Sequence, residues 1–185
     1  YFCWSARVSS ECSVVAIGGI YDDDAASNAG HVRIYENDNG TWTQIGSDID
    51  GEANSDHSGN SVSLSGDGSV VAIGARYNDG GGTNSGHVRI YENNNGTWTQ
   101  IGSDIDGEGN SDYFGWSVSL SGDGSVVAIG AQGDDDAGTD AGHVRVYEDI
   151  GRNTLAFTTT DNIAPTLSSS SPADNATLVA LDSSI

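Results

Sequence analysis

The sequence contains no lysine and no methionine, only two prolines and two cysteines, and very little positive charge. Six arginines face 27 acidic side chains, which gives a formal net charge of -21 at pH 7. A protein that neutralises phosphates needs a basic stripe, whereas these arginines are scattered singly through the chain. The composition therefore excludes nucleic acid as a partner and disfavours anionic membranes.

Two cysteines are too few to staple a domain of this size, so they do not fix the redox compartment. No apolar stretch approaches the length of a transmembrane helix, and we expect no membrane insertion. What the chain does contain is 36% hydrophobic residues and 26 glycines. Valine, isoleucine, threonine, tyrosine and tryptophan carry the apolar content while leucine is sparse, which favours strands over helices. The sequence predicts a packed, all-β protein.

A repeat of 56 residues organises the chain. The motif Gly-His-Val-Arg-Ile-Tyr-Glu at residues 30–36 recurs at residues 86–92, and with valine for isoleucine at residues 142–148. Similarity at a fixed period indicates units that pack against their neighbours. Cys3 and Cys12 stand where the later repeats carry glycine, and the sequence leaves open whether they pair.

Each repeat reads as four short strands. Residues 117–120 alternate polar and apolar side chains, and residues 125–131 are apolar on both faces, as in a strand covered on either side. Residues 87–91 alternate again, an Asn-Gly pair then predicts a tight hairpin, and residues 97–101 supply the fourth strand. Four antiparallel strands per repeat predict the blades of a β-propeller, because each small sheet buries its faces only against neighbouring blades.

We place the blades at residues 1–56, 57–112 and 113–157, the last with an atypical fourth strand. Propellers carry about four to eight blades, so three blades make an incomplete ring. Tyr1 falls inside a repeat, and we expect the missing blades of the same parent chain to precede it.

The composition changes at the C-terminal end of the chain. Residues 158–185 are rich in serine, threonine, proline and alanine, which predicts a linker. Within it, Ala-Pro-Thr-Leu at residues 164–167 and Ser-Pro-Ala-Asp-Asn at residues 171–175 resemble the opening of a bacterial Ig-like domain. We therefore expect the truncated start of such a domain after the last blade.

Tyr-Phe-Gly-Trp-Ser at residues 113–117, followed by Val-Ala-Ile-Gly-Ala at residues 127–131, resembles the FG-GAP repeat of integrin-α-type β-propellers. The resemblance covers residues 1 to about 150, although the second repeat has Ser58 in place of the phenylalanine. It implies propeller blades, commonly seven, in extracellular proteins of adhesion and ligand binding.

The same resemblance implies calcium, which blades of that family often hold in an Asp-rich loop between their first two strands. Here that loop is only Ser121-Gly122-Asp123-Gly124. One carboxylate cannot supply the six to eight oxygens that calcium prefers. We therefore expect no family-type calcium site at this turn.

Alternating carboxylates ahead of a glycine turn also occur in the two segments that link the blades. Such a pattern can converge on a hard cation. The candidate metal ligands are Asp48, Asp50, Glu52, Asp56, Asp104, Asp106, Glu108 and Asp112. The alternative to a metal site is a solvated interblade loop. The sequence therefore predicts no cofactor with certainty, and calcium is the cation to test. The acidic runs at residues 22–24 and 134–136 are weaker candidates, because consecutive side chains point apart in an extended chain.

His31, His87 and His143 occupy one position in three repeats, so they are expected far apart, in a scaffold role rather than together in one metal site. Trp42 and Trp98 are likewise equivalent. Packing in the core or between blades is favoured over a platform for sugar rings at these positions.

Neither a nucleophile elbow nor a phosphate loop nor a Cys/His pairing occurs, which predicts that the chain is not an enzyme. Two functions stay open. The favoured one is an extracellular or cell-surface module for adhesion, ligand binding or scaffolding, with a protein or glycan partner. The alternative is an accessory propeller of a secreted enzyme whose catalytic domain lies outside this fragment.

Overall fold

The computed structural model describes residues 3–139, 141–148, 150, 155–160 and 163–167. Within this part of the chain there are strands and turns and no helix, which confirms the all-β prediction. The strands are β1 (Ser5–Val8), β2 (Val14–Gly19), β3 (His31–Asp38), β4 (Thr41–Gln44), β5 (Ile49–Asp50), β6 (Ser61–Leu64), β7 (Val70–Ala75), β8 (His87–Asn94), β9 (Thr97–Gln100), β10 (Ile105–Asp106), β11 (Phe114–Leu120), β12 (Val126–Ala131), β13 (His143–Glu148), β14 (Leu155–Thr160) and β15 (Ile163–Leu167). The described residues include no segment that could cross a bilayer as a helix.

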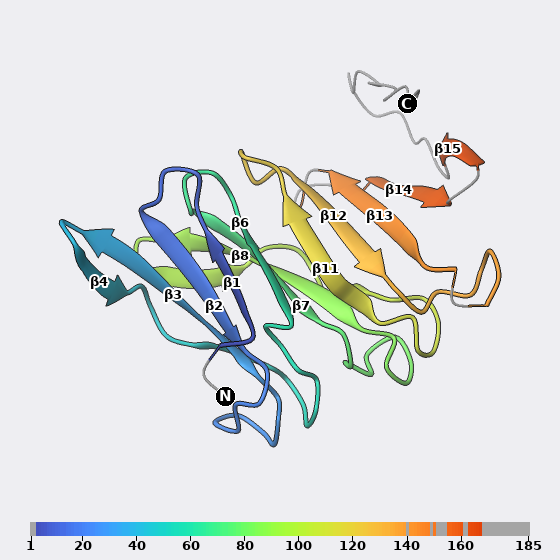
Figure 1. The fold of residues 1–185 in the computed structure, drawn as a ribbon, viewed down its shortest axis with the longest axis horizontal. Helices are drawn as coiled ribbons and strands as arrows, with labels where there is room; N and C mark the ends of the chain where they lie inside the picture. The colour runs from blue at the N-terminus through green and yellow to red at the C-terminus, as the bar shows by residue number, and fades with distance from the viewer. Residues whose placement is uncertain (1–2, 140, 149, 151–154, 161–162, 168–185) are drawn as a thin grey trace.

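The strands form three antiparallel sheets that follow the three repeats. In the first sheet the order is β1-β2-β3-β4, and in the second β6, β7, β8 and β9 pair in the same succession. Figure 1 shows the sheets side by side in sequence order, the first in blue, the second in green and the third in yellow and orange. The predicted four-stranded blades are thereby confirmed, and the three sheets do not close into a barrel.

Each of the first two blades also has a short fifth strand, which the sequence reads only as a link between blades. β5 pairs with the first residues of β3, with Asp50 opposite His31, whereas β4 pairs with the last residues of β3. β10 pairs with β8 in the same way, with Asp106 opposite His87. This pairing brings the acidic interblade segment beside the histidine of its own blade.

The third sheet has the order β11-β12-β13-β14-β15. β14 takes the place of β4 but has none of the Thr-Trp-Thr-Gln sequence, and it pairs with β13 from Val144 to Glu148 rather than only with its last residues. β15 continues the sheet beyond residue 158, where the composition predicts a linker. Residues 168–185, with most of the predicted Ig-like start, lie outside the described residues.

The hydrophobic core lies between the blades rather than inside any one of them. One cluster joins Val32 and Ile34 of β3 to Ile73 of β7, and a second joins Val88 of β8 to Phe114 of β11. Each of these five residues is no more than 2% exposed. A single blade could not bury these residues alone, so adjacent blades stabilise each other.

Backbone contacts at the blade boundaries are close enough to require glycine. Gly86 forms a parallel bridge with Phe114, as Gly30 does with Ser58 one boundary earlier. A Cβ atom on Gly86 would lie 2.1 Å from the carbonyl oxygen of Phe114. The backbone of Gly86 has a φ of +75° and that of Gly30 a φ of +77°, both in the left-handed region. The repeated glycine therefore sets how closely one blade approaches the next.

Candidate functional site

Loops from neighbouring repeats gather along one edge of the molecule, at the bottom of Figure 1. These are the loops between the second and third strands of each blade and the segments that link the blades. The amide of Ser27 donates to Asn54 Oδ1 at 3.1 Å, and Thr83 donates equivalently to Asn110 at 2.9 Å. Acidic residues of both kinds of loop are thereby brought to the same edge.

Two of the predicted metal ligands in the first interblade segment are engaged by protein groups. Arg33 Nε donates to Asp48 Oδ2 at 2.8 Å, and Gln44 Nε2 donates to the other oxygen at 2.6 Å. Burial opposes ionisation of Asp48, but these hydrogen bonds prevail and lower its pKa. Asp56 is buried and accepts a hydrogen bond of 2.9 Å from Asn78 Nδ2.

The second interblade segment is engaged in a similar way. Asp112 is buried and accepts a hydrogen bond of 2.7 Å from the amide of Gly109. Glu108 forms an ion pair with Arg145 of the third blade. The pKa of Asp106 is raised, first by burial and then by the neighbouring Asp104.

The eight predicted acids do not form a cluster of their own. Among the described residues, no three of them bring ligand atoms within 4.8 Å of one another. The structure instead forms two mixed groups in which such atoms do lie within 4.8 Å: Asp22, His31 and Asp50, and Glu52, His87 and Asp104. Each group combines carboxylates from loops with a buried histidine from the third strand of a blade.

In the first group His31 already has an acidic partner. His31 Nδ1 lies 2.9 Å from Asp22 Oδ2. Burial acts to raise the pKa of Asp22, but hydrogen bonds from the Asp24 amide and from His31 outweigh it and lower that pKa. The pKa of Asp50 is raised, first by burial and then by the charge of Asp48. The group therefore contains a paired carboxylate and one whose charge is disfavoured.

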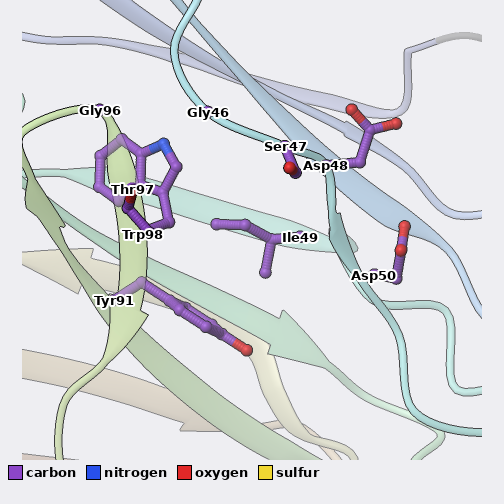
Figure 2. Close-up of a pocket in the computed structure, with 9 residues that line it drawn as sticks. All are labelled: Gly46, Ser47, Asp48, Ile49, Asp50, Tyr91, Gly96, Thr97 and Trp98. Carbon is purple, nitrogen blue, oxygen red and sulfur yellow. The ribbon is translucent and has the colours of Figure 1, made fainter.

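A pocket of about 350 Å³ lies between the first and second blades. Its lining residues are Gly46, Ser47, Asp48, Ile49, Asp50, Tyr91, Gly96, Thr97 and Trp98. Figure 2 shows Ile49 between the Trp98 ring and the side that carries Asp48 and Asp50, with the Tyr91 ring below. The pocket thus combines an apolar, aromatic wall with an acidic rim.

Trp98 fixes the blade boundary beside this pocket. Its indole Nε1 donates to the carbonyl of Ile45 in the first blade at 3.0 Å, and its ring packs against the first core cluster. The equivalent Trp42 is 47% exposed. The structure therefore places Trp98 in the interblade packing that the sequence favours, with part of its ring also lining the pocket.

An aromatic row, which sequence reasoning missed, crosses all three blades. Successive rings meet edge to face with centroids 4.9–6.4 Å apart, and the members are Trp4, Tyr21, His57, Tyr77 and Tyr113. The Arg76 guanidinium lies over the rings of Tyr77 and Trp116, at 4.8 and 4.5 Å. Edge-to-face rings attract each other beyond their area burial, so the row ties adjacent blades together.

The mixed histidine groups were also missed, because their members have no shared spacing. His87 is grouped with Glu52, which precedes its blade, and with Asp104, which lies later in the same blade. A signal in the sequence was that each repeat contains both a histidine and acidic segments. Sequence reasoning compared the three histidines with one another and did not consider each together with the acids of the neighbouring loops.

Two segments, residues 47–91 and 102–147, match the FG-GAP repeat family. Each match begins in an interblade segment and ends in the third strand of the following blade. No curated protein matches the sequence significantly. FG-GAP repeats build propeller-type binding or scaffold modules, are typical of extracellular proteins and often bind calcium.

Among solved structures, a crystal structure from Bacteroides uniformis named as a 6-phosphogluconolactonase is similar to this chain, with a TM-score of 0.56 and 16% sequence identity. The alignment covers 88% of this chain but only 39% of the other. At this identity the likeness concerns the fold alone. The resemblance of the sequence to FG-GAP repeats is confirmed by the two repeat matches: the chain contains FG-GAP repeats, and its sheets are propeller-type blades.

Proposed function

We propose that this chain is part of an extracellular, non-catalytic propeller that binds a neutral glycan in the pocket between its first two blades. The observation that carries the proposal is the pairing of an aromatic wall, Trp98 and Tyr91, with the carboxylates of Asp48 and Asp50. Aromatic rings stack on the apolar faces of sugars, and carboxylates accept hydrogen bonds from sugar hydroxyls. The net charge of -21 disfavours an acidic glycan.

An enzymatic role has less support in the described residues. The serine hydroxyls that donate to carboxylates there do so within turns, to Asp67 and Asp123. No described serine or cysteine is hydrogen-bonded to a histidine, and the side chains of His31, Arg33 and His143 are paired with carboxylates instead. The similar structure named as a 6-phosphogluconolactonase nevertheless makes lactone hydrolysis the specific activity to assay. An accessory role beside a separate catalytic domain is compatible with the same glycan site.

We also infer that a further blade packs on the third. Gly18 and Gly74 each lie against a backbone carbonyl of the following blade, whereas among the described residues the equivalent Gly130 has only Ser117 near its Cβ position. A pocket of about 380 Å³ opens there beside Trp116 and other residues of the third blade. The repeat geometry makes this surface suitable for another blade of the parent protein.

For calcium, we infer weak binding at most, and none at the Ser-Gly-Asp-Gly turns. Asp123 Oδ1 accepts hydrogen bonds from Ser121 Oγ at 2.6 Å and from the amide and hydroxyl of Ser125 at 3.1 and 2.8 Å. These hydrogen bonds lower the pKa of Asp123 to about 2. Its carboxylate closes the turn, so it is poorly placed to bind an ion.

The glycan proposal is tested by screening the 185-residue chain against neutral oligosaccharides, with Trp fluorescence and calorimetry as readouts. Asp50→Asn keeps the shape of the rim and removes its charge, and we expect at least tenfold weaker binding. Asp106→Asn is the matched control, because Asp106 is the equivalent residue one blade later and does not line the pocket. Trp42→Ala tests the exposed equivalent of Trp98, and we expect unchanged affinity.

A glycan that binds all three variants as tightly as the parent chain would contradict the pocket assignment. Turnover of 6-phosphogluconolactone that a point substitution within the chain abolishes would contradict the non-catalytic part of the proposal.

A further inference from the structure

The His87 imidazole is buried against two carboxylates without bonding to either. Its side chain is 2% exposed. Its Nδ1 lies 3.9 Å from Glu52 Oε2 and 4.0 Å from Asp104 Oδ2, beyond hydrogen-bond distance. Within the described part of the chain, this nitrogen has no nearer acidic partner. Three potential ligand atoms therefore surround a small space between two interblade segments.

The other two blades show what this histidine lacks. His31 Nδ1 lies 2.9 Å from Asp22, and His143 Nδ1 lies 2.7 Å from Asp134. The second blade has Asn78 at that position. The Asn78 amide donates to Asp56 instead, at 2.9 Å. A single change from aspartate to asparagine thus leaves His87 directed at Glu52 and Asp104.

The two carboxylates are held by their outer oxygens. Gln100 Nε2 donates to Asp104 Oδ1 at 2.7 Å, which leaves Oδ2 directed at His87. Arg89 Nη1 lies 3.5 Å from Glu52 Oε1, which leaves Oε2 directed at His87. Outer partners of this kind orient the ligands of a metal ion.

The imidazole is neutral at physiological pH. Burial, followed by the nearby positive charge of Arg89, lowers the pKa of His87 to about 4. Metal ligands must be deprotonated, so this environment removes the competition between protons and a metal at pH 7. Arg89 also offsets part of the repulsion between the two carboxylates when no ion is bound.

From this geometry we propose that Glu52, His87 and Asp104 bind a divalent transition metal of the zinc class. Imidazole with carboxylates suits zinc and its neighbours better than calcium, which prefers six to eight oxygens. Tetrahedral ligands of zinc lie about 3.4 Å apart, given bond lengths of about 2.0–2.2 Å. Glu52 is 46% exposed and Asp104 33% exposed in their side chains, so both can move the remaining distance. Three protein ligands leave a fourth position for water or for a ligand atom.

The site is tested by calorimetric titration of Zn²⁺ into the metal-stripped chain at pH 7, with Co²⁺ absorption as a report on coordination geometry. We expect one ion per chain and a tetrahedral Co²⁺ spectrum. Glu52→Gln and Asp104→Asn keep side-chain shape at positions that are not buried, and each should weaken binding at least tenfold. Glu108→Gln, the same change one repeat later, should leave the affinity unchanged.

His87 is probed without removing it, because a buried substitution there could prevent folding. The imidazole resonances of His87 should shift on Zn²⁺ binding in the parent chain, and in the Glu52→Gln variant the same shift should require at least tenfold more Zn²⁺. Absence of one-to-one binding would overturn the proposal. So would equal affinity in the Glu52→Gln and Asp104→Asn variants, or loss of binding in Asp22→Asn, which would assign the ion to the first blade.

Discussion

Ser61 Oγ donates a hydrogen bond of 2.8 Å to the backbone carbonyl of Gly115, across the boundary between the second and third blades. Ser5 makes the same bond of 2.8 Å to Gly59 one boundary earlier. Each serine lies on the first strand of its blade, Gly59 just precedes the first strand of the next blade, and Gly115 lies on it. This contact therefore repeats with the blades and joins them independently of the apolar core.

Ser61→Ala should lower the free energy of unfolding by about 1 kcal/mol, because a partly buried carbonyl loses its hydrogen-bond donor. Ser117→Ala is the matched control: Ser117 is the equivalent residue of the third blade and makes no such bond within the described chain. Chemical denaturation of both variants measures the difference. Equal losses would mean that the hydroxyl acts within its own blade.

Gly115→Ala should be more damaging, by about 3 kcal/mol, because two costs combine. Gly115 has a φ of +83°, and an added Cβ would lie 2.5 Å from the carbonyl oxygen of His87. Gly122→Ala serves as the control, since nothing lies within 4 Å of its Cβ position. The unfolding midpoints of the two variants in urea compare the costs. A Gly115→Ala variant as stable as Gly122→Ala would show that the blades do not pack this closely.

Much of this fold could be predicted because each strand carries its own pattern. The apolar run of β12 and the Asn95-Gly96 hairpin, where Asn95 has a φ of 52° and Gly96 of 86°, lie where local sequence places them. The strand β10 has only two residues, too few for a hydrophobic period to be detected. It can pair with His87 and Val88 because β9 pairs only with the later residues of β8. Such strands follow from tertiary structure rather than from sequence pattern.

The site was less predictable for a related reason. Spacing identified the interblade acids, but it could not show that Asp48 is held by Arg33 while Glu52 extends toward His87. The first contact lies within one blade, whereas the second crosses from the interblade segment to the second blade, and spacing alone does not distinguish them. The Asn78 substitution was visible in the repeat, yet its effect on His87 required the distance between their loops.

Calcium and sodium should stabilise the chain equally at matched ionic strength. The net charge of -21 causes self-repulsion in the folded state, which any salt screens. Several interblade carboxylates are already bonded within the protein, Asp48 and Asp56 among them. Thermal unfolding in the two salts, repeated on the double variant Asp104→Ala with Asp106→Ala, measures this. A calcium-specific gain that the double variant loses would identify an interblade calcium site.

The aromatic row makes stability depend on pH through His57, which packs between Tyr21 and Tyr77 with ring centroids 5.3 and 4.9 Å away. Burial, and then the charge of Arg76, lowers the pKa of His57 below its ordinary value of 6.5. The unfolded chain therefore binds the proton more readily, and stability should fall as pH falls from 7 toward 5. His57→Tyr removes this contribution and should fold, because Tyr113 occupies the equivalent position with a φ of 54°, against 56° for His57. Melting temperatures between pH 7.5 and 5 should decline less in the variant than in the parent chain, with His87 contributing to the decline in both. Parallel curves would show that His57 titrates alike in the folded and unfolded states.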